Sequence, residues 1–506
     1  MGALKNSASS RRSKAVPGWA GILLCAAVLT CVSAAAIYFV QAEGTALFFG
    51  DAAAHLNIAR RLFDGRNPGY EQIGTVWLPL PHVLMMPFAK VDEWWRNGLA
   101  GAIPAGAAWV AAGTFLFAAL RRLFGTDGAV AGTAVFATQP NLLYLQASPM
   151  TESIFFACAL GILLFTVRLH ATGSPLDAAL AGLCACAATL TRYEGWILLP
   201  FVGLYILLNG GRRRWECALW FALIAGSGPL YWLGHNWVMY SDWLEFYRGI
   251  GSAKDIQKQL PYPGSHDWAA AGRQFAIAVK AVQGWPLVIL AVAGLVPAIA
   301  RRAFWPLGFC LISPLFYVWS LHSGDTPIYV PEVYPFSHYN SRYALAALPL
   351  FAVCAAALGA ALPRIRWAIP VVALSWFIFE PLIVKREGEV NSQSRRTWTN
   401  EVGAMLKAQY QSGTGILMPF GDLTGILQEA GIPIRECIHQ GDKLEFDRAT
   451  ARPDLFLDTA WVIAQSGDRA SNAMAKARAM GMPYRCVKLI SLPYSPVLEV
   501  WRRVSP

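Results

Sequence analysis

The chain of 506 residues is 55% hydrophobic and only 14% charged, and it contains 20 Trp and 26 Phe. This is more apolar material than a water-soluble protein usually buries, so the composition excludes an ordinary soluble enzyme and predicts a polytopic membrane protein. The net charge of +11 does not indicate a nucleic-acid partner, because the Arg and Lys residues stand in short runs between apolar segments, where they orient helices against the cytoplasm.

The first elements are a basic tail and a membrane anchor. Residues 1–18 are polar and basic, and Trp19–Val40 is an apolar run long enough to cross a bilayer. The basic residues place the N-terminus in the cytoplasm. Ala34-Ala35-Ala36 resembles a signal-peptidase site, but the apolar run continues to Val40. We therefore expect an uncleaved signal anchor.

A large external loop, residues 41–97, follows the first span. It is too polar to cross the membrane, yet it contains Trp77 in a Pro-rich stretch and the pair Trp94-Trp95. Aromatic and Pro-rich pieces suit the headgroup layer of a bilayer. We expect interfacial helices and loops that lie on the outer face.

Further apolar runs predict the remaining spans. They are a run that ends at Arg121-Arg122 and the runs Ala129–Leu145, Ile154–Val167, Ala178–Thr189, Trp196–Leu208, Phe221–Met239, Trp285–Ala300, Phe304–Ser320, Tyr343–Leu362 and Trp367–Val384. Every short inside loop carries Arg, so the prediction is a helical membrane domain over residues 19–384 with about 11 spans. The N-terminus is then inside and residue 384 outside.

Residues 385–506 have a mixed, water-soluble composition. Strand-like runs alternate with helical patterns, which is typical of a small α/β layer domain. The strand-like runs are Gly415–Met418, Ala460–Ala464, Arg485–Ile490 and Val497–Trp501, and the helical patterns are Leu423–Ala430 and Ala470–Met480. Because the last span leads outward, we expect this domain outside the cytoplasm, covering the mouth of the site.

Cysteine usage separates the two parts of the chain. Eight of the ten Cys lie in or beside apolar runs, and Cys437 and Cys486 are the two in the C-terminal region. In an oxidising compartment these two can form a disulfide, and the alternative is a pair of buried free thiols.

Charged side chains gather on the predicted outer face, from loops far apart in sequence. They are Asp51, His55, Glu152, Arg192, Glu194, His338 and Arg342. Taken singly, most are ordinary solvated loop residues. Asp51 differs, because Phe48-Phe49-Gly50 precedes it and Ala52-Ala53-Ala54 follows it. Carboxylates and guanidinium groups concentrated at one membrane rim indicate a reaction site.

Four short stretches in this order resemble a known superfamily. They are Gly-Asp-Ala-Ala-Ala-His-Leu-Asn-Ile-Ala-Arg from Gly50, Met150-Thr151-Glu152, Leu190-Thr191-Arg192-Tyr193-Glu194-Gly195, and Asn340-Ser341-Arg342-Tyr343-Ala344. Together they resemble pieces of GT-C fold glycosyltransferases, particularly bacterial relatives of protein mannosyltransferases and aminoarabinose transferases. The resemblance covers residues 19–384 and does not extend to the C-terminal region.

The resemblance implies a chemistry. In that superfamily a sugar moves from a polyprenyl-phosphate carrier to a lipid, glycan or protein acceptor on the non-cytoplasmic face, usually with inversion. The acid of the first external loop, here Asp51, is the implied general base. A single carboxylate suffices, because the leaving group is already a phosphate anion. That anion needs fixed positive charge, for which Arg342 is the first candidate and Arg192 the second.

The other predicted site residues have open roles. Glu152 orients the acceptor, holds a divalent cation with Asp51, or pairs with Arg192. His55 would share the face of Asp51 on a helix, and Glu194, His338 and Tyr339 are expected to contact substrate. The first loop has no Asp-x-Asp motif. We therefore predict no protein metal site, with a divalent cation as an open possibility.

Two alternatives remain from the sequence. One is a transporter or flippase, although no inverted repeat is visible and most spans have no charge near their centres. The other is a lipid-linked oligosaccharide transferase or ligase of similar fold. In each case the expected location is a bacterial inner membrane, crossed many times.

Overall fold

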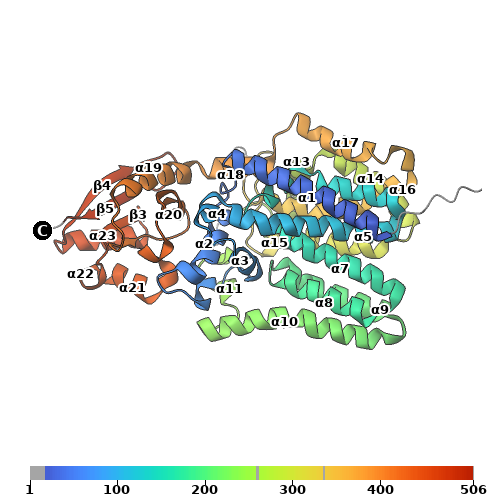
Figure 1. Ribbon diagram of the computed structural model, residues 1–506, viewed down its shortest axis with the longest axis horizontal. Coiled ribbons are helices and arrows are strands. Elements are labelled where there is room, and N and C mark those ends of the chain that lie inside the picture. The colour runs from blue at the N-terminus through green and yellow to red at the C-terminus, as the bar shows by residue number, and fades with distance from the viewer. Residues whose placement is uncertain (1–17, 258–260, 334–336, 505–506) are drawn as a thin grey trace, which may run out of the picture.

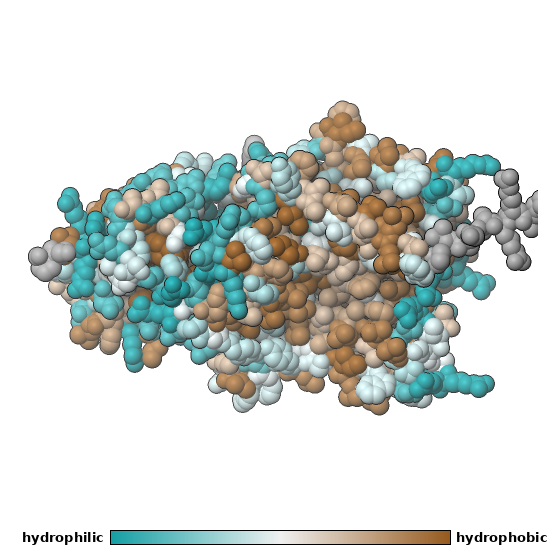
Figure 2. Space-filling view, in the orientation of Figure 1, coloured by the Kyte–Doolittle hydropathy of each residue, from teal (hydrophilic) through white to brown (hydrophobic). Residues whose placement is uncertain are grey.

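The computed structural model describes residues 18–257, 261–333 and 337–504 (Figure 1). The predicted basic tail lies almost wholly outside the described residues. A bundle of long helices occupies one end of the molecule, and a small sheet with its own helices occupies the other. In Figure 2 a broad hydrophobic band covers the bundle, with hydrophilic residues on the C-terminal region and a smaller hydrophilic zone at the opposite end. This is the surface that a membrane-spanning bundle requires.

The helices of the bundle arise from the predicted apolar runs, with one exception, Trp268–Gln283, which the apolar runs did not predict. The bundle helices are α1 (Gly18–Ala42), α5 (Leu99–Ala137), α7 (Glu152–Thr172), α8 (Pro175–Thr189), α9 (Glu194–Asn209), α10 (Arg214–Tyr240), α13 (Trp268–Gln283), α14 (Trp285–Ala300), α15 (Phe304–Ser323), α16 (Leu348–Ala361) and α17 (Ala368–Leu374). By length and composition, seven helical stretches among the described residues can cross a membrane, or eight if the bent pair α13 and α14 counts as one. The predicted helical membrane fold is confirmed.

Helix α5 contains one predicted span and the first half of the next, Ala129–Leu145, which continues in α6 (Pro140–Gln146). At Gly125 the backbone leaves the helical region, with φ 74° and ψ −176°, a left-handed value that glycine adopts without a steric penalty. A Cβ on Gly132 would lie 2.7 Å from Cδ1 of Leu120. In a straight helix these residues would be about 18 Å apart. The chain therefore reverses at Gly125, as the charged turn after Arg121-Arg122 predicts.

The predicted external loop, residues 41–97, forms short helices. They are α2 (Gly50–Asp64), the 3-10 helix η1 (Tyr70–Ile73), α3 (Leu80–Met85) and α4 (Asp92–Asn97). Helix α2 buries its apolar face, including Leu56 and Ala59. Trp95 is only 2% exposed, and its indole nitrogen donates to Asn57 Oδ1 at 2.9 Å. The prediction that Trp95 lies in the headgroup layer is wrong, because the C-terminal region covers it.

The C-terminal region is a layered α/β unit, as predicted. Its elements are α18 (Ile383–Asn391), α19 (Gln393–Gln409), β1 (Ile416–Leu417), α20 (Gly425–Ala430), β2 (Cys437–Ile438), α21 (Leu444–Ala451), α22 (Pro453–Phe456), β3 (Trp461–Gln465), α23 (Arg469–Ala479), β4 (Tyr484–Ile490) and β5 (Leu498–Arg503). The strand order is β2-β1-β3-β5-β4. Strand β1 runs parallel to β2 and β3, whereas β5 runs antiparallel to β3 and β4.

One face of this sheet shares its core with the external loop. Leu56, Met85 and Trp95 belong to the same buried cluster as Trp398 of α19 and Ile416 of β1. Ion pairs border the cluster, with Arg435 to Asp64 at 2.5 Å and Arg66 to Glu445 at 2.6 Å. The C-terminal region is thus packed onto the helices that follow the first span, and α2 lies between it and the bundle (Figure 1).

The two cysteines of the C-terminal region are free. Cys437 lies in β2 and Cys486 in β4, the two outer strands of the five-stranded sheet. Neighbouring strands are about 4.8 Å apart, which separates the outer strands by roughly 19 Å. A disulfide requires Cα atoms within about 7 Å. The disulfide alternative is wrong. Both thiols are free, but only Cys437 is buried, whereas Cys486 is half-buried.

Candidate active site

A cavity of about 560 Å³ opens where the external loop meets the bundle. Its walls come from α2, from the segment before α7, from the turn between α8 and α9, from α15, and from the 3-10 helix η3 (Ser341–Ala347) that leads into α16. Of the predicted site residues, Asp51, His55, Glu152, Arg192, Glu194, Tyr339 and Arg342 line it. His338 does not line it, and its carbonyl accepts from Asn391 Nδ2 at 2.8 Å.

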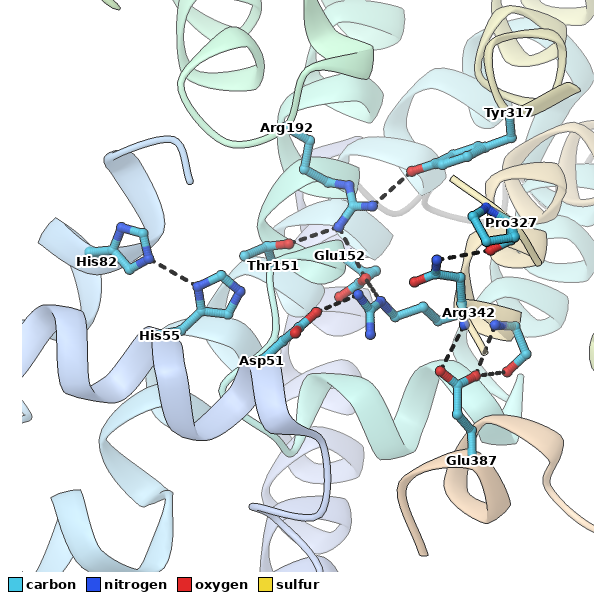
Figure 3. A network of polar contacts seen from close by, with 12 residues as sticks. Asp51, His55, His82, Thr151, Glu152, Arg192, Tyr317, Pro327, Arg342 and Glu387 are labelled. Carbon is cyan, nitrogen blue, oxygen red and sulfur yellow. Dashed lines mark hydrogen bonds and ion pairs between the residues drawn. The ribbon is translucent and has the colours of Figure 1, made fainter. Parts of the chain in front are cut away.

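Asp51 and Arg342, which both line the cavity, form an ion pair (Figure 3). Asp51 is in the first turn of α2, and Arg342 is in η3, 291 residues later. Arg342 Nη2 donates to Asp51 Oδ2 at 2.5 Å. The guanidinium also lies over the rings of Phe49 and Tyr343, at 5.4 and 5.2 Å from their centroids. Stacking on aromatic faces holds the planar fork in one orientation while its charge stays near apolar surroundings.

Glu152 joins this pair to a second arginine. Its Oε1 lies 3.1 Å from Arg342 Nε and 3.0 Å from Arg192 Nη1. Arg192 also donates to Thr151 Oγ1 at 2.8 Å and to the Tyr317 hydroxyl at 2.7 Å. One carboxylate therefore holds two guanidinium groups side by side, as Figure 3 shows. Of the three roles open for Glu152, the geometry favours pairing with arginine.

Glu194 supports Arg192 from the other side. Its Oε1 lies 3.4 Å from Arg192 Nε, and its side chain is buried. With this contact Arg192 is held by Glu152, Glu194 and Tyr317, so its position is fixed before any ligand arrives. Tyr317 lies on α15 within an apolar span, and no sequence signal distinguishes it from the other aromatic residues there.

A histidine pair forms the wall beside Asp51. His55 lies one turn after Asp51, and its Nδ1 is 2.9 Å from Nε2 of His82. The ring of Trp77 packs on His55 at 4.7 Å. Burial lowers the pKa of His55 to about 4, although the nearby carboxylates oppose this. His55 is therefore neutral at pH 7. His82, on α3, was missed from sequence, because it stands in a Pro-rich stretch with no charged residue beside it.

The charge state of Asp51 follows from its neighbours. Burial acts to raise the pKa of this carboxyl, but the positive charge and the hydrogen bond of Arg342, together with the charge of Arg395, outweigh burial and lower it below its ordinary value. Asp51 is therefore ionised at neutral pH. A carboxylate paired with a guanidinium group in this way is a weak base, and it becomes a better proton acceptor when the guanidinium binds another anion.

The donor set suits an anion better than a metal ion. Among the residues that the structure describes, no three His, Cys, Asp or Glu side chains come together as metal ligands. Asp51, Glu152 and Glu194 each face an arginine. Two neighbouring guanidinium groups in a largely apolar cavity form a typical binding place for phosphate.

Comparison with known proteins agrees with this geometry. Residues 92–232, which include Glu152, Arg192 and Glu194, match the family described as dolichyl-phosphate-mannose-protein mannosyltransferase. A search of the curated proteins finds no match.

Two solved structures share the fold over almost the whole chain. ArnT from Cupriavidus metallidurans bound to undecaprenyl phosphate has a TM-score of 0.60 at 12% identity, covering 96% of this chain and 98% of that one. The apo state of the same protein gives a TM-score of 0.58 at 14% identity, covering 95% and 98%. The fold is therefore the GT-C fold. The family match over residues 92–232 is to mannosyltransferases, and the shared fold extends over almost the whole chain.

The GT-C fold that the sequence motifs indicated is confirmed. The family match over residues 92–232 favours an enzyme over the transporter or flippase alternative, because that family is one of mannosyltransferases. The shared fold extends over the C-terminal α/β region as well, which the motifs did not cover.

Proposed function

We propose that this protein transfers a sugar from a polyprenyl-phosphate carrier to an acceptor hydroxyl on the extracytoplasmic face of the membrane, with inversion. The observation that carries the proposal is the Asp51 to Arg342 pair, a carboxylate and a guanidinium 2.5 Å apart in one cavity. The first is the base that the acceptor needs, and the second is the charge that the leaving phosphate needs.

The two partners separate when the donor binds. The donor phosphate takes Arg342 as its partner, and Arg192 lies beside it because Glu152 contacts both guanidinium groups. Asp51 then loses its strongest cationic neighbour and its basicity rises. The pair is thus a resting state in which the base is held inactive until the donor arrives.

Transfer then proceeds in one displacement. The acceptor oxygen attacks the anomeric carbon from the side of Asp51, and a new carbon–oxygen bond forms. The bond from that carbon to the phosphate oxygen breaks, and its electron pair leaves with polyprenyl phosphate. Asp51 takes the acceptor proton, and the two arginines stabilise the charge of the leaving phosphate. Attack opposite the leaving group inverts the configuration.

The apolar walls suit a lipid-linked donor. Trp196, Ile197, Phe316 and Trp319 line the cavity on α9 and α15, two helices of the bundle. Trp319 is 44% exposed, so the apolar wall continues to the surface that faces lipid. A polyprenyl chain can leave the cavity there while its phosphate stays with the arginines. Undecaprenyl phosphate is the ligand in the similar ArnT structure.

The function is tested in a strain that lacks the protein and in an assay with the purified protein. A deletion strain is expected to lose one sugar from a lipid, glycan or protein of its envelope, measured by mass spectrometry, and to accumulate the lipid-linked sugar. Purified protein in detergent should transfer sugar from an undecaprenyl-phosphate donor to an extract of that strain. Detergent removes the membrane barrier, so a flippase would show no activity in this assay.

Other outcomes separate the alternatives. Loss of an entire oligosaccharide block would identify the oligosaccharide transferase or ligase instead. An unchanged envelope together with inert purified protein contradicts the proposal.

The side of the membrane is tested separately. Loops carrying Asp51, Glu152, Arg192 and Arg342 converge at one end of the bundle, next to the C-terminal region. The Arg-rich turn at 212–214 belongs to a short inside loop by the charge rule. An alkaline phosphatase reporter should therefore be active when fused after Pro506 and inactive when fused after Arg214. The opposite pattern would place the site in the cytoplasm.

A further inference from the structure

The segment that leads from the bundle into the sheet contacts the residues next to each member of the Asp51 to Arg342 pair. It consists of α18 (Ile383–Asn391) and α19 (Gln393–Gln409). Neither Glu387 of α18 nor Arg395 of α19 lines the cavity. Each is nevertheless bonded to the short stretch of backbone that presents one member of the pair.

Glu387 holds the backbone just before Arg342. Its Oε1 accepts from the Asn340 amide at 2.8 Å, and its Oε2 accepts from the Ser341 amide at 2.8 Å and from Ser341 Oγ at 2.5 Å (Figure 3). Asn340 has a φ of 53°, and its Nδ2 donates to the Pro327 carbonyl at 2.9 Å. The carboxylate is 3% exposed. It therefore fixes the turn from which Arg342 extends.

Arg395 holds the backbone just before Asp51. Its Nη2 donates to the Phe48 carbonyl at 2.5 Å, and its Nε lies 3.6 Å from Asp422 of the C-terminal region. The guanidinium packs directly on Gly50, where an added Cβ would overlap Nη1. A glycine at this position thus leaves room for the arginine, and the arginine ties the start of α2 to the C-terminal region.

We propose that Glu387 and Arg395 are positioning residues that set the separation and orientation of Arg342 and Asp51. Through α18 and α19, the C-terminal region then affects the rate of the reaction without lining the cavity. This inference rests on the proposed function. A displacement of about 1 Å in a catalytic group can cost as much as 10²-fold in rate, so contacts of this kind control turnover without touching substrate.

Arg395 has an electrostatic effect that a purely structural residue lacks. The charged and titratable groups facing Asp51 are Arg342 from η3, His55 from α2, Arg395 from α19 and Tyr339 from the segment before η3. Arg395 is one of the groups that lower the pKa of Asp51. Without Arg395 the pKa of Asp51 rises. On acidification, the variant therefore loses activity at a higher pH than the wild type does.

The first test compares Arg395→Met with Arg435→Met in the full-length protein. Arg435 also joins the C-terminal region to α2, through Asp64 at 2.5 Å, but Asp64 keeps Arg60 as a second partner at 2.7 Å. For Arg395→Met we expect kcat to fall roughly 10- to 100-fold with little change in donor KM. The acidic limb of kcat/KM should move to higher pH. Arg435→Met should change neither.

Two further variants show whether the contact itself matters. Arg395→Lys keeps the charge, so it should restore the pH profile and recover part of kcat. Gly50→Ala displaces the guanidinium and should lower kcat in the same direction as Arg395→Met. Equal kcat and equal pH profiles for wild type and Arg395→Met, with both proteins folded, would overturn the role of Arg395.

Glu387 is tested against a matched glutamate. Like Glu387, Glu436 accepts three hydrogen bonds, here from the Gly413 amide and from the hydroxyls of Ser412 and Tyr410. It lies away from the cavity. Glu387→Gln should weaken donor binding about 10-fold by releasing Arg342, whereas Glu436→Gln should not. Equal donor affinity in the two variants would overturn the role of Glu387. A wild-type protein that transfers no sugar would contradict the proposed function, whatever the variants do.

Discussion

Asp51→Asn is expected to reduce sugar transfer by about 10² to 10⁴, the usual cost of losing a positioned general base. The amide keeps the shape of the side chain but cannot take the acceptor proton. Arg342 loses its partner at 2.5 Å and becomes more available to the donor phosphate. Donor binding should therefore stay the same or tighten while kcat falls. The two quantities are measured by single-turnover transfer and by competition with undecaprenyl phosphate.

The matched control is Asp92→Asn. Asp92 also pairs with an arginine, Arg60 at 2.6 Å, and it lies in the same external loop, but it is outside the cavity. Its replacement should leave both quantities unchanged. Wild-type turnover by purified Asp51→Asn would remove Asp51 as the base.

Arg342→Ala is expected to weaken donor binding by roughly 10- to 100-fold, the size of a lost hydrogen bond to a charged group. Turnover should fall as well, because the leaving phosphate loses stabilisation that grows in the transition state. Arg342→Lys should recover only part of each loss, since an ammonium keeps the charge but not the planar fork that reaches Asp51 and Glu152 together.

Arg168 provides the comparison for this pair of variants. Its Nε lies 2.9 Å from Asp177, so it joins α7 to α8 through a similar arginine–aspartate contact, but it does not line the cavity. Arg168→Lys should bind donor as the wild type does. If Arg342→Ala and Arg342→Lys also bind donor normally, the phosphate is held elsewhere, and Arg192 becomes the first candidate.

The sequence by itself determined the helical membrane class and much of the site. Long apolar runs have one stable form in a bilayer, because every backbone amide must find its partner within the segment. Alternating spans then place Asp51, Glu152, Arg192 and Arg342 on one side, and the structure brings these four together in one cavity. Strands β1, β3, β4 and β5 and helices α20 and α23 were also readable from their periodicity, whereas β2, α19, α21 and α22 were not.

Only the tertiary structure decided how the two parts of the chain meet. The sequence predicts that Trp95 is an interfacial residue, but it lies in a buried cluster that includes residues of α19 and β1. Cys486 lies in a predicted strand and Cys437 in none, and the strand order puts them at opposite edges of the sheet. Glu387 and Arg395 act on segments 46 and 347 residues away. Periodicity reports what one segment buries, whereas such contacts depend on which segments pack together, and no local pattern records that choice.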